Sequence, residues 1–179
     1  MAGCDYGKDI ECPYWTCKKV LEMKQVVEHL QDVHSSTLEA ANASGKLPID
    51  ICRHRYPTET SQVEYGIFPA PPRIIKYDSR IFIDNFIVRD DSWIMWVSIL
   101  GSENDAKKYE VKMTASPEED TPGQVSIRSK VYSTDVRKED VLKDEEGGLE
   151  LSKRLVKQLA AVEDGNKYKI EIDCQIMKK

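Results

Sequence analysis

Four side chains near the start of the chain are suited to binding a metal ion. Four residues separate Cys12 from Cys17, eleven separate Cys17 from His29, and four separate His29 from His34. Zinc prefers four nitrogen and sulfur ligands in a tetrahedron, and a short cysteine turn followed by two histidines on a helix supplies them. Because protein side chains fill all four positions, none is left for a catalytic water, and the spacing predicts one structural zinc ion.

The residues between the cysteines and the last histidine are expected to form the helix that carries both histidines. Residues 18–33 contain no glycine or proline and are rich in helix formers. Val26 and Leu30 lie four residues apart, so on a helix they share a face beside His29 and form a small apolar core. We assign residues 1–36 to a zinc-finger domain. It depends on its metal, because zinc contributes roughly 10–16 kcal/mol of apparent binding energy in such short peptides.

The remaining cysteines do not form an obvious set. Cys4 has three interpretations: it replaces Cys12 as a ligand, it is the last ligand of a preceding finger, or it is free. We favour Cys12 as the ligand, because the shorter turn to Cys17 closes more easily around one ion. The chain has five cysteines, three of them crowded at the N-terminus beside two histidines. This distribution is typical of an intracellular metal site rather than a disulfide framework, so we expect a cytoplasmic protein, with the nucleus as the alternative.

Composition and charge narrow the classes of partner. With 40% hydrophobic and 32% charged residues, the chain can bury a core and is not expected to be disordered. The formal charge is −5 with acids and bases interspersed, whereas a surface that binds phosphates needs an excess of cations. Nucleic acid is therefore disfavoured, and a nucleic-acid-binding zinc finger is kept only as the lesser alternative. No run of 18 apolar residues occurs, so no membrane span is expected.

Residues with the chemistry for catalysis are present but are not arranged as a catalytic site. His54 is the only histidine outside the metal-binding pattern, and Cys52 is its nearest nucleophile. Residues two apart on a strand share a face without necessarily touching. In addition, no neighbouring residue in the sequence could orient His54 as a catalytic base. The acidic runs 118–120 and 144–146 lie beside proline or glycine and are interpreted as solvated loops. We therefore predict no catalytic residue.

The second half of the chain has the pattern of β-strands. Residues 93–100 are apolar almost throughout, as expected for a strand covered on both faces, whereas residues 168–176 alternate apolar and polar side chains. Leu151, Leu155 and Leu159 lie four apart and predict a helix over 149–160 that lays one apolar stripe on a sheet. Further strands are expected at 81–88, 109–114 and 125–132.

These elements predict a mainly β fold, an antiparallel β-sandwich with one short helix, preceded by the finger. We assign residues 73–179 to the sandwich and residues 37–72 to a linker and edge segment. Residues 35–50 are small and polar, with Gly45 and Pro48 near their end, and are interpreted as a connector. Residues 135–148 (DVRKEDVLKDEEGG) are interpreted as a solvated, mobile loop.

The order of these parts resembles a known family. The finger CPYWTCKKVLEMKQVVEHLQDVH resembles the second zinc finger of the seven-in-absentia ubiquitin ligases. WIMWVSILGSENDAKKYEVKMTA, VSIRSKVYSTD and GNKYKIEIDCQI are similar to strands of that family's substrate-binding domain, and the segment around LSKRLVKQLA to its helix. The resemblance covers nearly the whole chain. It implies a TRAF-like eight-stranded sandwich, a homodimer, and binding of target or adaptor peptides for ubiquitin-dependent degradation.

Two features depart from the family pattern. Family members carry a RING domain and another finger upstream, for which this sequence has no room, so ligase activity is expected only with a RING that precedes this chain. In the family an extended peptide pairs with an edge strand near the start of the sandwich. The corresponding stretch PRIIKYDS lacks the family's acid-tryptophan-valine pattern, and its candidate peptide-binding residues are Ile74, Ile75, Lys76 and Tyr77. The alternative is a non-catalytic structural adaptor whose partner docks elsewhere.

Overall fold

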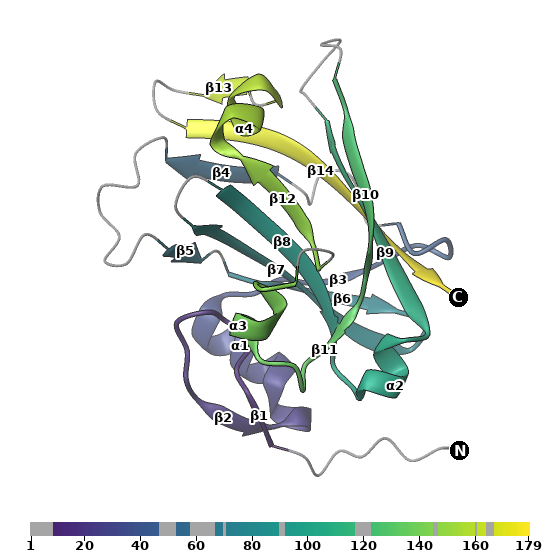
Figure 1. Cartoon of the computed structure of the whole chain (residues 1–179). Coiled ribbons are helices and arrows are strands. Elements are labelled where there is room, and N and C mark those ends of the chain that lie inside the picture. The colour runs from purple at the N-terminus through teal and green to yellow at the C-terminus, as the bar shows by residue number, and fades with distance from the viewer. Residues whose placement is uncertain are drawn as a thin grey trace.

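The protein is built mainly from two β-sheets with a small N-terminal unit against one of them (Figure 1). The computed structural model describes residues 9–46, 53–57, 67–69, 71–89, 92–116, 123–144, 147–159, 161–163 and 167–179. The predicted fold class is confirmed: the chain is mainly β, and the four candidate ligands come before the sheets.

The N-terminal unit is a β-hairpin followed by a helix. Strand β1 (Asp9–Glu11) pairs antiparallel with β2 (Val20–Glu22), and the chain continues through the 3-10 turn η1 (Met23–Gln25) into α1 (Val26–His34). The helix is shorter than the predicted 18–33, because residues 20–22 pair with β1 instead of joining the helix. As predicted, Val26 and Leu30 are fully buried on the face beside His29.

The larger sheet has seven strands and lies next to this unit. Strand β8 is central, with β7 on one side and β12 and β11 on the other, and β7 in turn pairs with β6 and β5. Strand β3 pairs in parallel with β6, and β11 pairs in parallel with β8. The sequence predicted an antiparallel sheet, and these two pairs depart from that prediction. The seven strands are β3 (Leu38–Ala40), β5 (Ile67–Pro69), β6 (Arg73–Tyr77), β7 (Arg80–Arg89), β8 (Ser92–Ile99), β11 (Tyr132–Ser133) and β12 (Leu149–Ser152).

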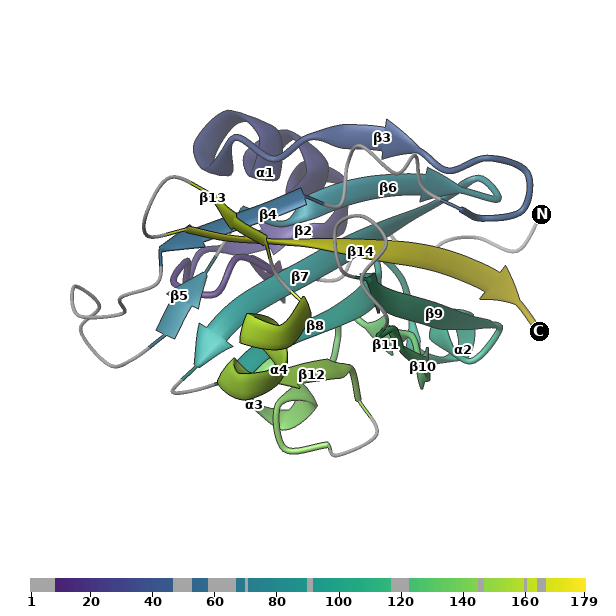
Figure 2. The ribbon, with the colours of Figure 1, turned by 90° about the horizontal axis from the view of Figure 1, so that it is seen from above.

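The smaller sheet has five strands and covers the inner face of the first. Its long strand β14 pairs with β9 along one half and with β4 and β13 along the other, while β10 pairs with β9. From above, β14 crosses over β7 and β8, as the strands of two stacked layers do (Figure 2). The five strands are β4 (Arg53–Pro57), β9 (Tyr109–Ser116), β10 (Val125–Lys130), β13 (Ala161–Glu163) and β14 (Lys167–Lys178).

In the described part of the chain, three short helices join the strands: α2 (Glu103–Ala106), α3 (Lys138–Val141) and α4 (Lys153–Leu159). The predicted helix over 149–160 is in fact two elements, because residues 149–152 pair with β8 as β12 and only then does α4 begin. The segment 135–148, interpreted from the sequence as a mobile loop, contains α3, and the side chains of Lys138 and Val141 are buried there.

The main core lies between the two sheets and follows the predicted alternation. Strand β9 contributes Tyr109, Val111 and Met113, and the C-terminal half of β14 contributes Ile172, Cys174 and Ile176. The backbone of β14 is described at residues 168 and 170, but the side chains at these two positions lie outside what the structure describes. The opposing sheet supplies the core residues Ile75, Phe82, Phe86, Val88, Trp93, Met95, Val97 and Ile99.

The outer face of the seven-stranded sheet is covered as well. Ile74 and Ile83 pack with Val26 and Leu30 of the finger, which joins the finger and the sheet in one apolar cluster. A second outer cluster consists of Ile87, Ile94, Trp96, Tyr132 and Val141, with Trp15 of the finger packed against it. This double cover explains why β8 is apolar almost throughout, as predicted for residues 93–100, and why residues 82–88 of β7 are buried on both faces.

The segment expected to be a connector also belongs to the sheets. Residues 38–40 form β3, and the turn that follows them rests on β14, where the backbone N–H of Ile176 donates to the carbonyl of Gly45 at 3.0 Å. Lys46 and Gln175 form an isolated antiparallel bridge at the same place. The turn thereby links the edge of one sheet to the other. Within the described residues, no helix has the length and apolar character needed to cross a membrane.

Candidate metal centre

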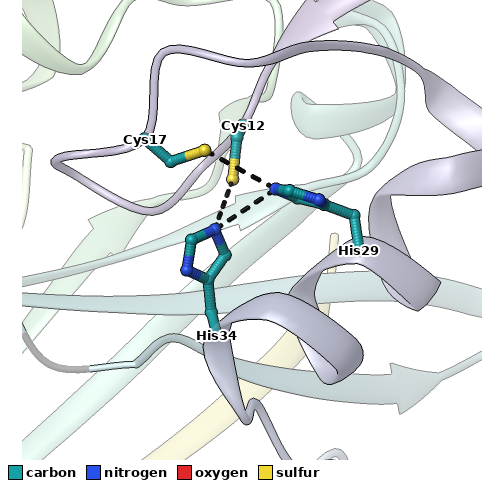
Figure 3. A group of neighbouring side chains, drawn as sticks. All are labelled: Cys12, Cys17, His29 and His34. Atoms are coloured by element: carbon teal, nitrogen blue, oxygen red, sulfur yellow. Dashed lines mark hydrogen bonds between the residues drawn. The ribbon is translucent and has the colours of Figure 1, made fainter.

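The four predicted ligands meet at one point. The ligand atoms of Cys12, Cys17, His29 and His34 all lie within 4.8 Å of one another, and it is the sulfur of each cysteine and a ring nitrogen of each histidine that converge (Figure 3). Cys12 Sγ is 3.5 Å from His34 Nε2, Cys17 Sγ is 3.5 Å from His29 Nε2, and the two Nε2 atoms are 3.2 Å apart.

These separations fit a tetrahedral metal centre. With metal–sulfur bonds of about 2.3 Å and metal–nitrogen bonds of about 2.05 Å, a tetrahedron places sulfur and nitrogen about 3.6 Å apart and two nitrogens about 3.3 Å apart. The observed 3.5 and 3.2 Å agree with both values. Two thiolates and two imidazoles in this geometry are a donor set for a borderline-soft divalent ion.

Two local structures bring the ligands together. Cys12 follows β1 directly, where its backbone N–H donates to the carbonyl of Lys19 at 2.8 Å, and the N–H of Cys17 donates to the carbonyl of Tyr14 at 3.1 Å. These bonds fold residues 12–19 into a closed loop that points both sulfurs toward α1. His29 lies within α1 and His34 is its last residue, because Ser35 adopts a left-handed conformation with φ 54° and ends the helix.

The site is sheltered from solvent. Cys12 is fully buried and His29 is 7% exposed. The ring of Tyr14 lies on that of His34 with the centroids 4.3 Å apart, and the rings of His29 and His34 meet edge to face at 4.9 Å. A site closed in this way holds its ion by protein groups alone and suits a structural role.

Without an ion, the surroundings set the protonation states of three ligands. Burial raises the pKa of the Cys12 thiol to about 12; a backbone hydrogen bond near Tyr14 opposes this, while the nearby Cys17 adds to it. Burial lowers the pKa of His29, helped by the charge of Lys19, and burial lowers that of His34, helped by His29 and Lys138. The imidazoles are therefore held neutral and ready to bind an ion, whereas the Cys12 thiol must lose a proton first.

One residue of the centre was missed by the sequence analysis. Lys138, at the start of α3, is 9% exposed, and its ammonium donates to the carbonyls of Cys12, Tyr14 and Cys17 at 2.7, 3.0 and 3.3 Å. It also forms an ion pair with Glu11 at 3.1 Å. Burial would raise the pKa of Glu11, but the hydrogen bonds and charges of Lys138 and Lys18 outweigh it and hold that pKa below its usual range. The only sequence signal was the apolar trio Val136, Val141 and Leu142 in an otherwise charged segment, which indicates packing rather than free solvation.

The residues proposed for peptide binding are not metal ligands, although Ile74 packs in the same apolar cluster as Cys12. Ile74 and Ile75 are fully buried, Lys76 is exposed and Tyr77 is half-buried. Residues 74–76 pair with β7 on one side and with β3 on the other, so both hydrogen-bonding edges of β6 are used at these positions. An extended peptide could pair there only by displacing β3. Their role in peptide binding stays a prediction.

The other candidates contribute nothing to the centre. Cys174 is buried in the main core. His54 belongs to β4, where its backbone is opposite Ile170, while its side chain, Cys4 and Cys52 lie outside the described residues. The metal ligands are the only group of three or more histidine, cysteine or acidic residues with metal-binding geometry in the described part of the chain.

No protein-family model matches the chain, and no curated protein sequence matches it.

Proposed function

We propose that this chain is a zinc-stabilised protein-interaction module, which binds target or adaptor proteins for ubiquitin-dependent degradation in the manner of the seven-in-absentia family. The observation that carries the proposal is the Cys2His2 centre placed directly against a β-sandwich, in the same order as the sequence resemblance implies. Such a unit offers a rigid surface to a partner and needs no reaction chemistry of its own.

Zinc is the ion that suits this donor set best. Tetrahedral sites with two sulfur and two nitrogen ligands are typical of structural zinc, and the separations among Cys12, Cys17, His29 and His34 match its bond lengths. When bound, the ion supplies a cross-link between the loop 12–19 and helix α1. Purified protein is expected to carry one zinc per chain by elemental analysis. A metal-free chain whose finger stays folded in chelator would contradict the assignment.

The degradation role is tested by capture of partners. Tagged protein, expressed in cells whose proteasome is inhibited, is expected to enrich ubiquitin-ligase subunits and ubiquitin-modified proteins. A double variant, Lys76→Glu with Tyr77→Ala, tests the predicted peptide site, and Lys107→Glu serves as a matched control because Lys107 is exposed and lies elsewhere, after α2. Enrichment no greater than that of an unrelated β-sandwich would contradict the proposal. Purified chain alone should build no ubiquitin chains.

One observation favours a second function, that of a structural adaptor whose partner docks away from β6. Both edges of β6 are already paired at residues 74–76, whereas β10 pairs with β9 alone among the described strands. An unpaired edge is where an extended peptide adds to a sheet. The adaptor function predicts that the Lys76→Glu, Tyr77→Ala variant captures the same partners as the unchanged chain.

A further inference from the structure

A buried lysine of the sandwich lies inside the loop that holds two of the metal ligands. Lys138 is separated from Cys12 by 126 positions in the sequence, yet its ammonium is 2.7 Å from that residue's carbonyl. It reaches the carbonyls of Tyr14 and Cys17 as well, at 3.0 and 3.3 Å. The three carbonyl oxygens belong to the loop 12–19, and all three accept hydrogen bonds from the Lys138 ammonium.

The loop 12–19 and the neighbouring Glu11 of β1 supply all the acceptors that this ammonium needs. An ammonium has three protons to donate, and here three carbonyls and the Glu11 carboxylate at 3.1 Å accept them. Lys138 is only 9% exposed, so water cannot replace these partners without movement of the chain. A buried cation that loses its acceptors is strongly destabilised. The burial of Lys138 therefore depends on a loop that keeps its three carbonyls together.

Backbone hydrogen bonds close this loop, and a bound metal would hold its carbonyls more firmly in place. Cys12 and Cys17 are two of the ligands, and their carbonyls are two of the acceptors, so an ion that fixes both sulfurs also fixes both oxygens. We propose that Lys138 is a positioning residue that couples occupancy of the metal centre to the outer face of the seven-stranded sheet. Loss of the metal loosens the turn, frees Lys138 and α3, and uncovers the sheet beneath them. The inference rests on the proposed zinc site.

A cavity lies where this uncovering would begin. It measures about 160 Å³ and is enclosed on one side by finger residues, including Glu11 and Pro13, and on the other by the segment that carries Lys138. Its floor includes Asn85, Trp96 and Ser98, all buried. Because the two walls are joined by Lys138, separating them exposes Trp96, which is 3% accessible in the closed state. The zinc-free protein would thus present a surface around Trp96, Asn85 and Ser98 that the zinc-bound protein hides.

The test uses the full chain and two lysine variants of one segment. Lys138→Met removes the buried ammonium, and Lys143→Met is the matched control because Lys143 is 74% exposed and pairs only with Asp140 among the contacts described. Zinc affinity is measured by competition with a chelator, and hydrogen exchange of residues 134–142 and of β7 and β8 is measured with and without zinc. Urea unfolding of the zinc-bound forms reports whether each variant is folded.

The expected results are specific. Lys138→Met should weaken zinc binding at least about tenfold, while Lys143→Met leaves it unchanged. In the unchanged chain, zinc should slow hydrogen exchange of residues 134–142. The factor by which zinc slows this exchange should match the factor by which Lys138→Met weakens zinc binding, because coupling between two sites is reciprocal. Lys138→Arg, which keeps the charge and donors, should restore part of the coupling, and Glu11→Gln should weaken it less than Lys138→Met.

Three outcomes separate the possibilities. If the unchanged chain binds no zinc, the proposed zinc site fails and this inference fails with it. If zinc binds but Lys138→Met and Lys143→Met have equal affinity, or if zinc does not alter exchange of residues 134–142, only the coupling is overturned. If Lys138→Met fails to fold, Glu11→Gln and Lys138→Arg are compared with Lys143→Met instead. Zinc affinity and hydrogen exchange of residues 134–142 then decide whether the coupling exists.

Discussion

At the scale of single residues, the protonation of the metal ligands determines how the centre responds to pH. The Cys12 thiol has a pKa raised to about 12 by burial, so in the metal-free protein it carries its proton at neutral pH. The imidazoles of His29 and His34 have lowered pKa values because of their burial, and so are neutral there. Binding of an ion must therefore displace the Cys12 thiol proton rather than imidazole protons near neutrality.

We expect zinc affinity to rise with pH between about 6 and 8, because fewer protons then compete for the sulfurs. At least one proton should be released per ion bound, the one from Cys12. Titration calorimetry in buffers of different ionisation enthalpy counts these protons, and chelator competition gives the affinity. The idea fails if affinity is the same at both ends of this range. Cys12→Ser, which removes the perturbed thiol, is expected to release fewer protons and bind far more weakly.

A second prediction concerns the buried ion pair of Arg73 and Asp84. The two residues are opposite each other on β6 and β7, and they are 8% and 3% exposed. Arg73→Met leaves the Asp84 carboxylate without this partner and should lower the free energy of unfolding by about 3–5 kcal/mol. Urea unfolding measures the change. Arg128→Met is the control, since Arg128 pairs with Glu110 at the surface with its side chain 68% exposed, and its loss should cost at most about 1 kcal/mol.

The metal ligands could be predicted from the sequence, whereas Lys138 could not. Cys12, Cys17, His29 and His34 fall within one short segment, and their residue types and spacing already specify the chemistry. The contacts of Lys138 join positions more than 120 residues apart, and its partners are backbone carbonyls, which leave no mark in the sequence. A lysine in a charged segment is usually solvated, so the composition of residues 135–148 predicted that Lys138 is exposed, which is wrong.

At the scale of elements, the long alternating strands were predictable and the short paired ones were not. The pattern around β14 and β9 specifies which side chains face the core, because period-two alternation reflects the geometry of the strand itself. Residues 149–152 and 20–22 have helical patterns in the sequence but lie in β12 and β2, since pairing with β8 and β1 outweighs local propensity. The turn against β14 and the helix α3 also depend on distant partners.

The turn at Gly45 gives a prediction at this scale. Gly45 has φ +76°, and a Cβ placed there would lie 1.8 Å from the carbonyl oxygen of Ile176. Gly45→Ala combines a strained backbone with a clash against β14, so we expect it to lower the free energy of unfolding by at least about 2 kcal/mol. Chemical unfolding measures this. Ser44→Ala, at the exposed neighbouring position, should have a much smaller effect, and equal effects would contradict the proposed packing.

At the scale of the whole molecule, the family resemblance predicts a homodimer formed through the sandwich. Light scattering of purified protein at tens of micromolar should give a particle of about twice the 20.5 kDa chain mass. Since the predicted contact lies in the sandwich and not in the finger, Lys18→Glu, which reverses an exposed charge of the finger, should leave the particle mass unchanged. A particle of the mass of one chain at these concentrations would exclude the dimer.

Metal removal is expected to destabilise the sandwich as well as the finger, because the two share one apolar cluster. Ile74 and Ile83 of the sheet are fully buried against Val26 and Leu30 of the finger, so unfolding the finger exposes sheet residues to water. An ion present at a thousand times its dissociation constant stabilises the folded state by about 4 kcal/mol. Chelation should therefore lower the midpoint of thermal unfolding, and a single transition should be seen by both sheet and helix signals.

The matched variant is Cys17→Ser, which removes one ligand and should unfold at the same temperature with and without chelator. Re-addition of zinc should restore the midpoint of the unchanged chain but not that of the variant. If the finger were an independent domain, chelation would melt it in a separate, earlier transition and leave the midpoint of the sandwich where it was. Circular dichroism near 222 nm follows the helices. Tryptophan emission follows the sheet when it is recorded in a Trp15→Phe background, because Trp93 and Trp96 both lie on β8 whereas Trp15 lies in the finger. If the two unfolding curves coincide, the metal-bound finger and the sheet unfold together as one cooperative unit.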